Sequence, residues 1–246
     1  MLLSLVLLAA PASAQTFLDP ITMPTGPTAT AVLTDGTTVT GKPKVTPKGI
    51  GNIKKVTLKL EEGGKRKLAP GDVTELRLVP GGLAKAMSAM NAVSSISEAA
   101  KTNAGETMSR EEVLYVTGKL PNGKPALLQL LNPGFDGTIL VFPDPAGRET
   151  TQVAVGGLSV AGGAVKSYLV AKRSGGDTLL VKRQQYDKLW TELYGDCSAM
   201  TAPEKPEFDT MAADVASHAQ LCGPDAAPAP APAAEPALVE PVAEPA

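Results

Sequence analysis

Short segments in which apolar and polar residues alternate dominate the first third of the chain. The runs "TAVLT" at 30–34 and "TTVTG" at 37–41 are rich in β-branched residues, and the pair Asp35-Gly36 stands between them. Two such runs joined by Asp-Gly indicate a β-hairpin, because a type I′ turn needs positive φ at both central residues. We therefore predict a hairpin at this point.

Further strands follow with the same period. In 54–70, Val56, Leu58 and Leu60 alternate with Thr57 and Lys59, and Gly63-Gly64 supplies a turn, which predicts a second hairpin. In 72–80, Leu76 and Leu78 alternate with polar residues and Pro80 ends the run. Five short strands within 28–80 predict a small antiparallel sheet or a partly closed barrel.

The period changes from two to 3.6 residues after Pro80. Apolar residues then recur at helical spacing, at Leu83, Met87, Met90, Val93 and Ile96. This pattern predicts an amphipathic helix that packs its apolar face over the sheet, rather than a groove for a partner. The helix and the exposed connection that follows it together occupy residues 81–112.

The remaining chain predicts more strands and then two helices. Strand patterns separated by turns at 113–183 are typical of a meander or sandwich, and the apolar run "ALLQLL" at 126–131 indicates a central strand. Two amphipathic helices are expected in 184–222, the first stopped at Gly195. The fold class is thus α+β, mainly β: two antiparallel β-rich parts joined by a helix, with a disulfide-tied helical segment at the C-terminal end.

Both ends of the chain differ in composition from the middle. Leu2–Ala10 is apolar but shorter than the roughly 20 residues of a membrane span, and it precedes the small triplet Ala12-Ser13-Ala14. We therefore expect residues 1–14 to be a signal peptide, followed by a linker at 15–27. The Pro/Ala-rich tail at 223–246 has too few apolar residues to repay its ordering entropy, which predicts disorder.

Export changes the interpretation of the two cysteines, Cys197 and Cys222. In an oxidising compartment, two thiols in one small region usually pair. A bridge between them would close a loop of about 25 residues and stabilise the fold by roughly 3 to 4 kcal/mol. We predict this disulfide, in a protein that is periplasmic or extracellular.

Charge is distributed unevenly. The formal net charge is -2, yet residues 28–80 carry ten Lys/Arg against five Asp/Glu. Most of these cations are lysines at outward positions of the predicted strands, without interleaved aromatic residues for base stacking. A solvated face, with edge lysines that discourage aggregation, is the favoured interpretation. An anionic envelope polymer or an envelope protein stays open as a partner, and we expect no nucleic acid and no membrane-spanning segment in the mature chain.

No motif for catalysis, cofactor or metal binding is complete. The single histidine, His218, rules out sites that need two histidines, and a packed histidine beside a disulfide is favoured over a Cys197–His218 catalytic pair. Around Ser159, the glycines at 155–167 miss both the G-x-S-x-G and the P-loop spacing, so two tight turns explain them better. We assign no catalytic, cofactor-binding or metal-binding residue.

Several stretches resemble an uncharacterised family of secreted bacterial proteins of the Bacteroidota type, which has no assigned activity. They are "PALLQLLNPGFDGTILVFPDPAGRET", "VGGLSVAGGAVKSYLVAKRSGGDTLLVKRQQYDKLWTELYGDC", the closing "HAQLC" and the first hairpin, "LTDGTTVTGK". In these proteins a strand-rich region leads into a helix ending in "lfgdC". The resemblance implies export and transfers no functional residue, and the acidic Pro/Ala tail departs from it.

These observations predict an exported non-catalytic protein that serves as a binding or structural module of the bacterial envelope. Two alternatives stay open. A secreted hydrolase would use Asp/Glu or Ser residues assembled by the fold, and would show a cleft lined by buried acids. A carrier of an apolar ligand would show an enclosed pocket between the strands of 113–183.

Overall fold

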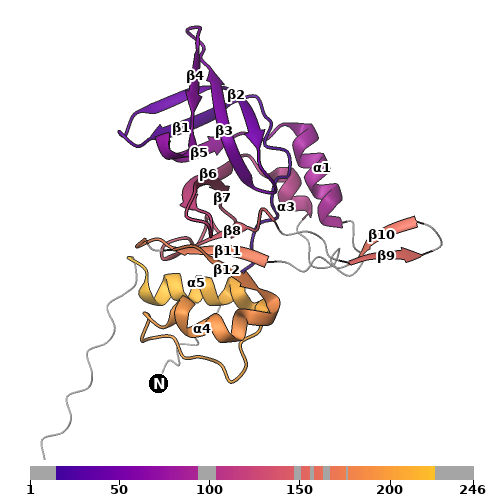
Figure 1. The fold of residues 1–246 in the computed structure, drawn as a ribbon, viewed down its shortest axis with the longest axis vertical. Helices are drawn as coiled ribbons and strands as arrows, with labels where there is room; N and C mark the ends of the chain where they lie inside the picture. Colours follow the sequence, from indigo (N-terminus) through magenta and orange to yellow (C-terminus); the bar gives the residue numbers. More distant parts are fainter. Residues whose placement is uncertain are drawn as a thin grey trace, which may run out of the picture.

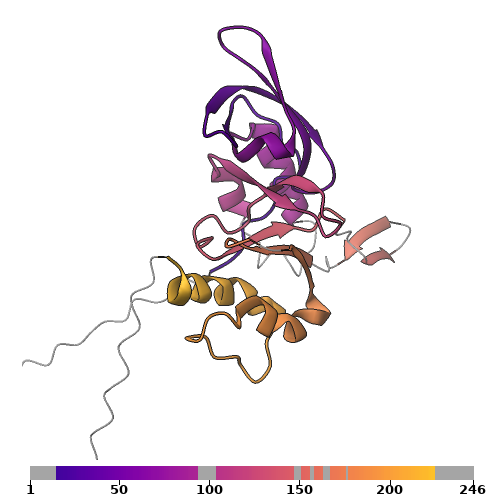
Figure 2. The ribbon, with the colours of Figure 1, turned by 60° about the vertical axis from the view of Figure 1, so that its left-hand side comes forward.

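Three tiers follow one another along the long axis of the molecule in a computed structural model of the chain. A β-barrel lies at one end, a three-stranded sheet in the middle, and helices α4 and α5 at the other end (Figure 1, Figure 2). The structure describes residues 15–93, 104–146, 151–155, 158–162, 167–175 and 177–224. The expected signal peptide and residues 225–246 of the expected tail lie outside this part of the chain.

Six strands of the described chain close into an antiparallel barrel. Their order is β2-β1-β5-β6-β7-β3, and β3 pairs back with β2 to complete the ring. A seventh strand, β4 (Lys65–Leu68), pairs with β3 outside the ring. The ring strands are β1 (Ala29–Leu33), β2 (Thr38–Pro47), β3 (Asn52–Lys59), β5 (Val73–Leu78), β6 (Val113–Lys119) and β7 (Pro125–Gln129).

The first hairpin confirms the prediction from Asp35-Gly36, but its turn is of another type. The Gly36 amide donates to the Leu33 carbonyl at 2.9 Å, and the Leu33 amide donates to the Thr37 carbonyl at 2.8 Å. Gly36 has φ 82°, whereas Asp35 keeps a negative φ. This is a three-residue turn in which one glycine takes the left-handed position, so the type I′ expectation of two positive φ angles is wrong.

Strands β6 and β7 join the barrel rather than the strands that follow them. β6 pairs with β5, and β7 pairs with both β6 and β3. These two strands therefore close the ring that β1, β2, β3 and β5 leave open. A separate antiparallel sheet has the order β12-β11-β8, from β8 (Ile139–Pro143), β11 (Ser167–Lys172) and β12 (Leu179–Lys182). Strands β9 (Thr151–Val155) and β10 (Leu158–Gly162) pair with each other.

The apolar run at 126–131 is a central strand, as its sequence predicts. Leu127 lies in the barrel core, while Leu128 on the opposite face packs with Phe142 of β8 and Leu169 of β11. Because β7 is buried on both faces, the barrel and the second sheet share it as a common wall.

Alternation along the second sheet places it between two layers. Phe142 and Leu169 face the barrel, whereas their neighbours Val141 and Val170 face the helices. Each face of the sheet is thereby buried, which is the usual requirement for a sheet in the middle of three layers.

Helix α1 (Gly82–Val93) lies beside the barrel together with the shorter α3 (Ala104–Ser109) (Figure 1). The expectation that its large apolar residues face the sheet is wrong for Leu83 and Met87, which are 69% and 41% exposed. Ala84 and Ser88 are buried instead, and Ser88 Oγ accepts a hydrogen bond from the Thr22 amide. Small side chains on this face let the helix lie close to the N-terminal segment that carries Thr22.

Residues 15–27 form no helix or strand, yet they are packed more tightly than the linker interpretation implies. Ile21 is fully buried in the barrel core, and the Leu18 amide donates to the Leu131 carbonyl at 2.8 Å. Phe17 stacks on Phe135 and meets the edge of Tyr168. This segment therefore contacts both the helical tier and the barrel.

The C-terminal tier confirms the two expected helices. α4 (Tyr186–Tyr194) and α5 (Met211–Cys222) are buried through their apolar faces against the second sheet. Short 3-10 turns precede β5, α4 and α5 at Pro70–Asp72, Arg183–Gln185 and Phe208–Thr210. No helix in the described ranges is long and apolar enough to span a membrane.

Candidate binding surface

Six lysines share the outer face of three neighbouring strands, and we call them the six-lysine face. Lys42 and Lys44 belong to β2, Lys55 and Lys59 to β3, and Lys65 and Lys67 to β4. Lys42 is paired with Lys59, and Lys59 with Lys65, in the strand register. These three cations therefore form a row across the strands at about 4.8 Å per step.

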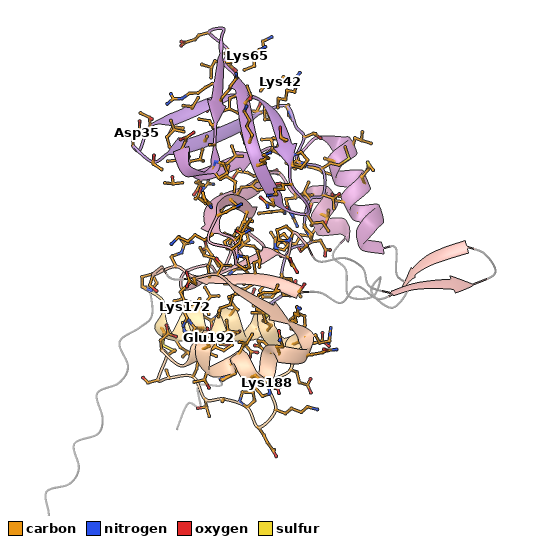
Figure 3. All side chains as sticks on the ribbon, in the orientation of Figure 1. Asp35, Lys42, Lys65, Lys172, Lys188 and Glu192 are labelled. Atoms are coloured by element: carbon orange, nitrogen blue, oxygen red, sulfur yellow. A yellow bond between two sulfur atoms is a disulfide. The ribbon has the colours of Figure 1, made fainter. Side chains whose placement is uncertain are left out.

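The strand period explains why these side chains point outward. Val45, Val56 and Leu68 occupy inward positions on the same three strands and pack in the barrel core. All six lysines are exposed. Figure 3 labels Lys42 and Lys65, whose side chains lie at the end of the barrel far from the helical tier.

None of the six ammonium groups forms an ion pair with any residue that the structure describes. The arginine on β5, elsewhere in the ring, behaves differently: Arg77 is paired with both Glu75 and Glu112. Like charges directly opposite each other on adjacent strands are unfavourable. The face is thus an array of cations that repel one another and attract an anion with several charges.

The edge-lysine interpretation explains only part of this face. β4 is the last strand of its sheet, so Lys65 and Lys67 stand on an edge. The register of β1 with β2 ends at Gly41, so Lys42 and Lys44 pair with β3 alone, whereas Lys59 is paired on both sides, with Lys42 and with Lys65. Protection from edge-to-edge pairing gives no reason for Lys59.

The predicted disulfide between Cys197 and Cys222 is present. The two Cα atoms lie 5.7 Å apart, and the bond joins the turn after α4 to the last residue of α5. Because its sulfur is bonded, Cys197 supplies no thiolate for a cysteine–histidine pair.

His218 is a packed residue, as favoured from the sequence, with a side chain only 3% exposed. Its Nδ1 lies 2.7 Å from Thr138 Oγ1, and its Nε2 lies 3.1 Å from Asp196 Oδ1. Burial acts to raise the pKa of Asp196, but hydrogen bonds from Lys172 and His218 outweigh it and lower that pKa. With both ring nitrogens engaged inside the protein, the histidine anchors α5 to the second sheet.

A buried tyrosine pair lies beside His218, with the ring centroids of Tyr194 and His218 5.8 Å apart. The Tyr186 hydroxyl donates to Asp214 at 2.6 Å and lies 3.0 Å from the Tyr194 hydroxyl. Burial raises the pKa of both phenols and that of Asp214. These shifts keep the phenols neutral, so the cluster joins helices α4 and α5 by hydrogen bonds.

A pocket between the second sheet and α4 bears on the two alternative functions. Its volume is about 180 Å³, and its wall includes Ile139, Val170 and Leu193. Typical small-molecule sites occupy roughly 300–1,000 Å³, so this pocket is small for an apolar cargo. Two acids, Asp177 and Glu192, also line it, but both are exposed rather than buried (Figure 3 labels Glu192). This pocket therefore lacks the buried acid pair expected of a hydrolase.

Comparison with protein-family models, with curated proteins and with solved structures gives no match for this chain. Among the described residues, no group of three or more His, Cys, Asp and Glu side chains is placed to hold a metal ion.

Sequence reasoning found the charge of the six-lysine face but not its arrangement. The excess of lysine at 28–80 is visible in composition, whereas the alignment of Lys42, Lys59 and Lys65 depends on the register of two hairpins. The lengths of the two turns could have suggested that register, since turn type fixes hairpin register.

Proposed function

We propose that the protein is an exported, non-catalytic binding module of the bacterial envelope that attaches to an anionic envelope polymer through the six-lysine face. The observation that carries this proposal is the set of six exposed lysines without ion-pair partners among the described residues, on one face of three adjacent strands, with Lys42, Lys59 and Lys65 in register. A polymer with regularly spaced anions can pair with several of these cations at once, which gives avidity without a deep pocket.

The chemistry of the face favours a polyanion without bases over a nucleic acid. Its outward positions hold lysine and threonine, such as Thr57 between Lys55 and Lys59, and no aromatic side chain on which a base could stack. Lysine acts as a point charge rather than a planar fork, so it suits phosphate or carboxylate groups in many orientations.

The disulfide supports the exported location in this proposal. Structural disulfides persist in secreted and periplasmic proteins and are rare in a reducing cytosol. Cell fractionation with intact-mass measurement tests the location: the proposal expects a form lacking residues 1–14, with no alkylatable thiol, outside the cytosol. A cytosolic protein that keeps its leader and both thiols would contradict it.

Binding is tested with the purified oxidised protein and soluble poly(glycerol phosphate), a regular polyanion without bases. Replacing Lys42, Lys44 and Lys59 by glutamine should weaken binding roughly 100-fold, because each lysine near an anionic surface contributes roughly a factor of five. All three side chains are exposed, so the fold should be unaffected.

A matched variant controls for net charge. Lys182, Lys188 and Lys205 are exposed lysines at and beyond the end of the second sheet, and their replacement by glutamine removes the same total charge. This variant should bind within about threefold of the unaltered protein. Equal losses in the two variants would show non-specific attraction and would refute the role of the face.

A further inference from the structure

The strand register places one threonine at the centre of the six-lysine face. Thr57 of β3 lies directly opposite Lys44 of β2 on one side and Lys67 of β4 on the other. Lys55 and Lys59 stand two residues before and after it on the same strand, so they share its face of the sheet. Thr57 therefore has a lysine in each of the four directions along and across the strands.

Two rows of side chains cross the three strands at this point. One row, Lys42, Lys59 and Lys65, holds a lysine on every strand, whereas the next row has Thr57 in the middle. Neighbouring strands are about 4.8 Å apart, and successive residues on one face of a strand are about 6.7 Å apart. Because threonine is much shorter than lysine, an anion that rests on the Thr57 hydroxyl has ammonium groups on several sides of it.

The hydroxyl of Thr57 is available to a ligand. It forms no hydrogen bond with any residue that the structure describes, and the residue is half-buried. Other threonines on the outside of the barrel use their hydroxyls within the protein. Thr30 Oγ1 lies 3.1 Å from Thr40 Oγ1, and Thr117 Oγ1 donates to the Pro70 carbonyl at 2.8 Å. Thr57 thus keeps an unused donor among the lysines.

No acid of the described chain neutralises the lysines around Thr57. The acids nearest in sequence, Glu61 and Glu62, lie in the turn between β3 and β4. Neither forms an ion pair with a described residue. An anion that approaches Thr57 therefore meets positive charge without competition from a carboxylate of this part of the protein.

The donors around Thr57 suit an anion with three terminal oxygens. Thr57 supplies one O–H group, and Lys44 and Lys67 each supply an ammonium group from opposite sides. A phosphate monoester or a sulfate ester presents three terminal oxygens, one for each of these donors. A carboxylate has only two oxygens, in one plane, so it leaves one of the three donors without an acceptor.

We infer that Thr57 determines the specificity of the six-lysine face, and that the ligand carries phosphate monoester or sulfate ester groups that accept a hydrogen bond from Thr57 between Lys44 and Lys67. The inference rests on the proposed attachment of an anionic polymer to this face. Charge attracts every polyanion to the lysines, whereas the hydroxyl distinguishes one polyanion from another. Phosphate and sulfate esters share this chemistry, and the experiment below separates them.

The test compares dextran sulfate with carboxymethyl dextran of the same length and degree of substitution. Each sulfate and each carboxylate carries one charge, so charge alone predicts equal affinity. At one fixed salt concentration, the purified oxidised protein should bind dextran sulfate about fivefold more tightly, which corresponds to one additional hydrogen bond. Equal affinity for the two polymers would overturn the inference.

Substitution of the threonine provides a second measurement. Thr57→Val removes the hydroxyl and keeps the β-branched shape that suits a strand. It should lower the affinity for dextran sulfate about fivefold and leave that for carboxymethyl dextran within about 1.5-fold. The matched control is Thr38→Val, on an exposed residue of β2 outside the six-lysine face, which should change neither affinity. Equal losses with both polymers in Thr57→Val, or no loss with either, would refute the role of the hydroxyl.

Dextran phosphate, which carries monoester groups, separates the two sources of the anion. If Thr57→Val weakens the binding of dextran phosphate more than that of dextran sulfate, the natural group is a phosphate monoester. A larger loss with dextran sulfate identifies a sulfate ester. Either result supports the inference, because each requires the hydroxyl.

Failure of this inference is distinguishable from failure of the proposed function. If replacing Lys42, Lys44 and Lys59 by glutamine leaves the binding of all three dextrans unchanged, the face is not the attachment surface and both proposals fail. If that variant binds weakly while Thr57→Val keeps the full preference for dextran sulfate, only the role of Thr57 is refuted.

Discussion

Loss of the disulfide should have a large and calculable effect on stability. Replacing Cys197 by alanine and Cys222 by serine removes the bond with little other change, because Cys197 is buried and Cys222 is exposed. The bond closes a loop with a sequence separation of 25 residues. The chain-entropy model then gives a stability loss of about 3.5 kcal/mol at 25 °C.

Urea unfolding followed by Trp190 fluorescence measures this loss. Trp190 is the single tryptophan of the chain and is buried in α4, so its emission reports the tier that the disulfide ties together. For a chain of this size, the loss corresponds to a decrease in Tm of roughly 7–14 °C.

Reductant supplies the control for this experiment. It should destabilise the unaltered protein by a similar amount and leave the double variant unchanged. The precision of the measurement is about 0.5 kcal/mol. A double variant whose free energy of unfolding lies within about this amount of that of the oxidised protein would refute the view that the bond restricts the unfolded chain.

Other predictions concern buried polar groups. Asn132→Ala should cost about 2–4 kcal/mol in urea unfolding, because Asn132 is fully buried and its Oδ1 accepts the Val141 amide at 2.9 Å; a loss below 0.5 kcal/mol at about the precision of the assay would contradict this. Carboxyl NMR should find the pKa of Asp214 above 3.8 and that of Asp196 below it, and the opposite order would be inconsistent with their contacts. Because the folded pKa of Asp214 is raised, its favourable contribution to stability is present at acidic pH and is lost as pH rises through that pKa. The contribution of Asp196 has the opposite sign: it is present above the unfolded pKa and is lost as pH falls through the lowered folded pKa.

Local signals in the sequence predicted the elements well, for physical reasons. Asp35-Gly36 provides a residue that adopts positive φ at no cost, so a turn there depends little on the rest of the chain. The spacing of Tyr186, Trp190, Leu193 and Tyr194 likewise places all four on the buried face of α4. Such patterns act within one element and need no knowledge of its neighbours.

Pairing between distant strands could not be predicted in the same way. The pairing of β6 with β5 joins Val113 to Leu78, and alternation alone does not say which strand edges meet. Helix α1 shows a second limit: its apolar residues Leu83 and Met87 are exposed because the contact uses Ala84 and Ser88. The size of an apolar side chain therefore does not predict which face of a helix is buried when small residues allow the helix to pack closely against its neighbour.

The six-lysine face was visible from the sequence only in part. Its excess of lysine leaves a trace in composition, and its geometry had to come from the fold.

The salt dependence of polymer binding tests the central claim most directly. A polyanion bound by several lysines releases counterions, so the logarithm of its affinity falls linearly with the logarithm of salt concentration, by roughly 0.7–0.9 per charge contact. Replacing Lys42, Lys44 and Lys59 by glutamine should make this slope shallower by about two to three, while the Lys182, Lys188 and Lys205 variant should keep the original slope. Identical slopes for the unaltered protein and the first variant would contradict attachment through the six-lysine face.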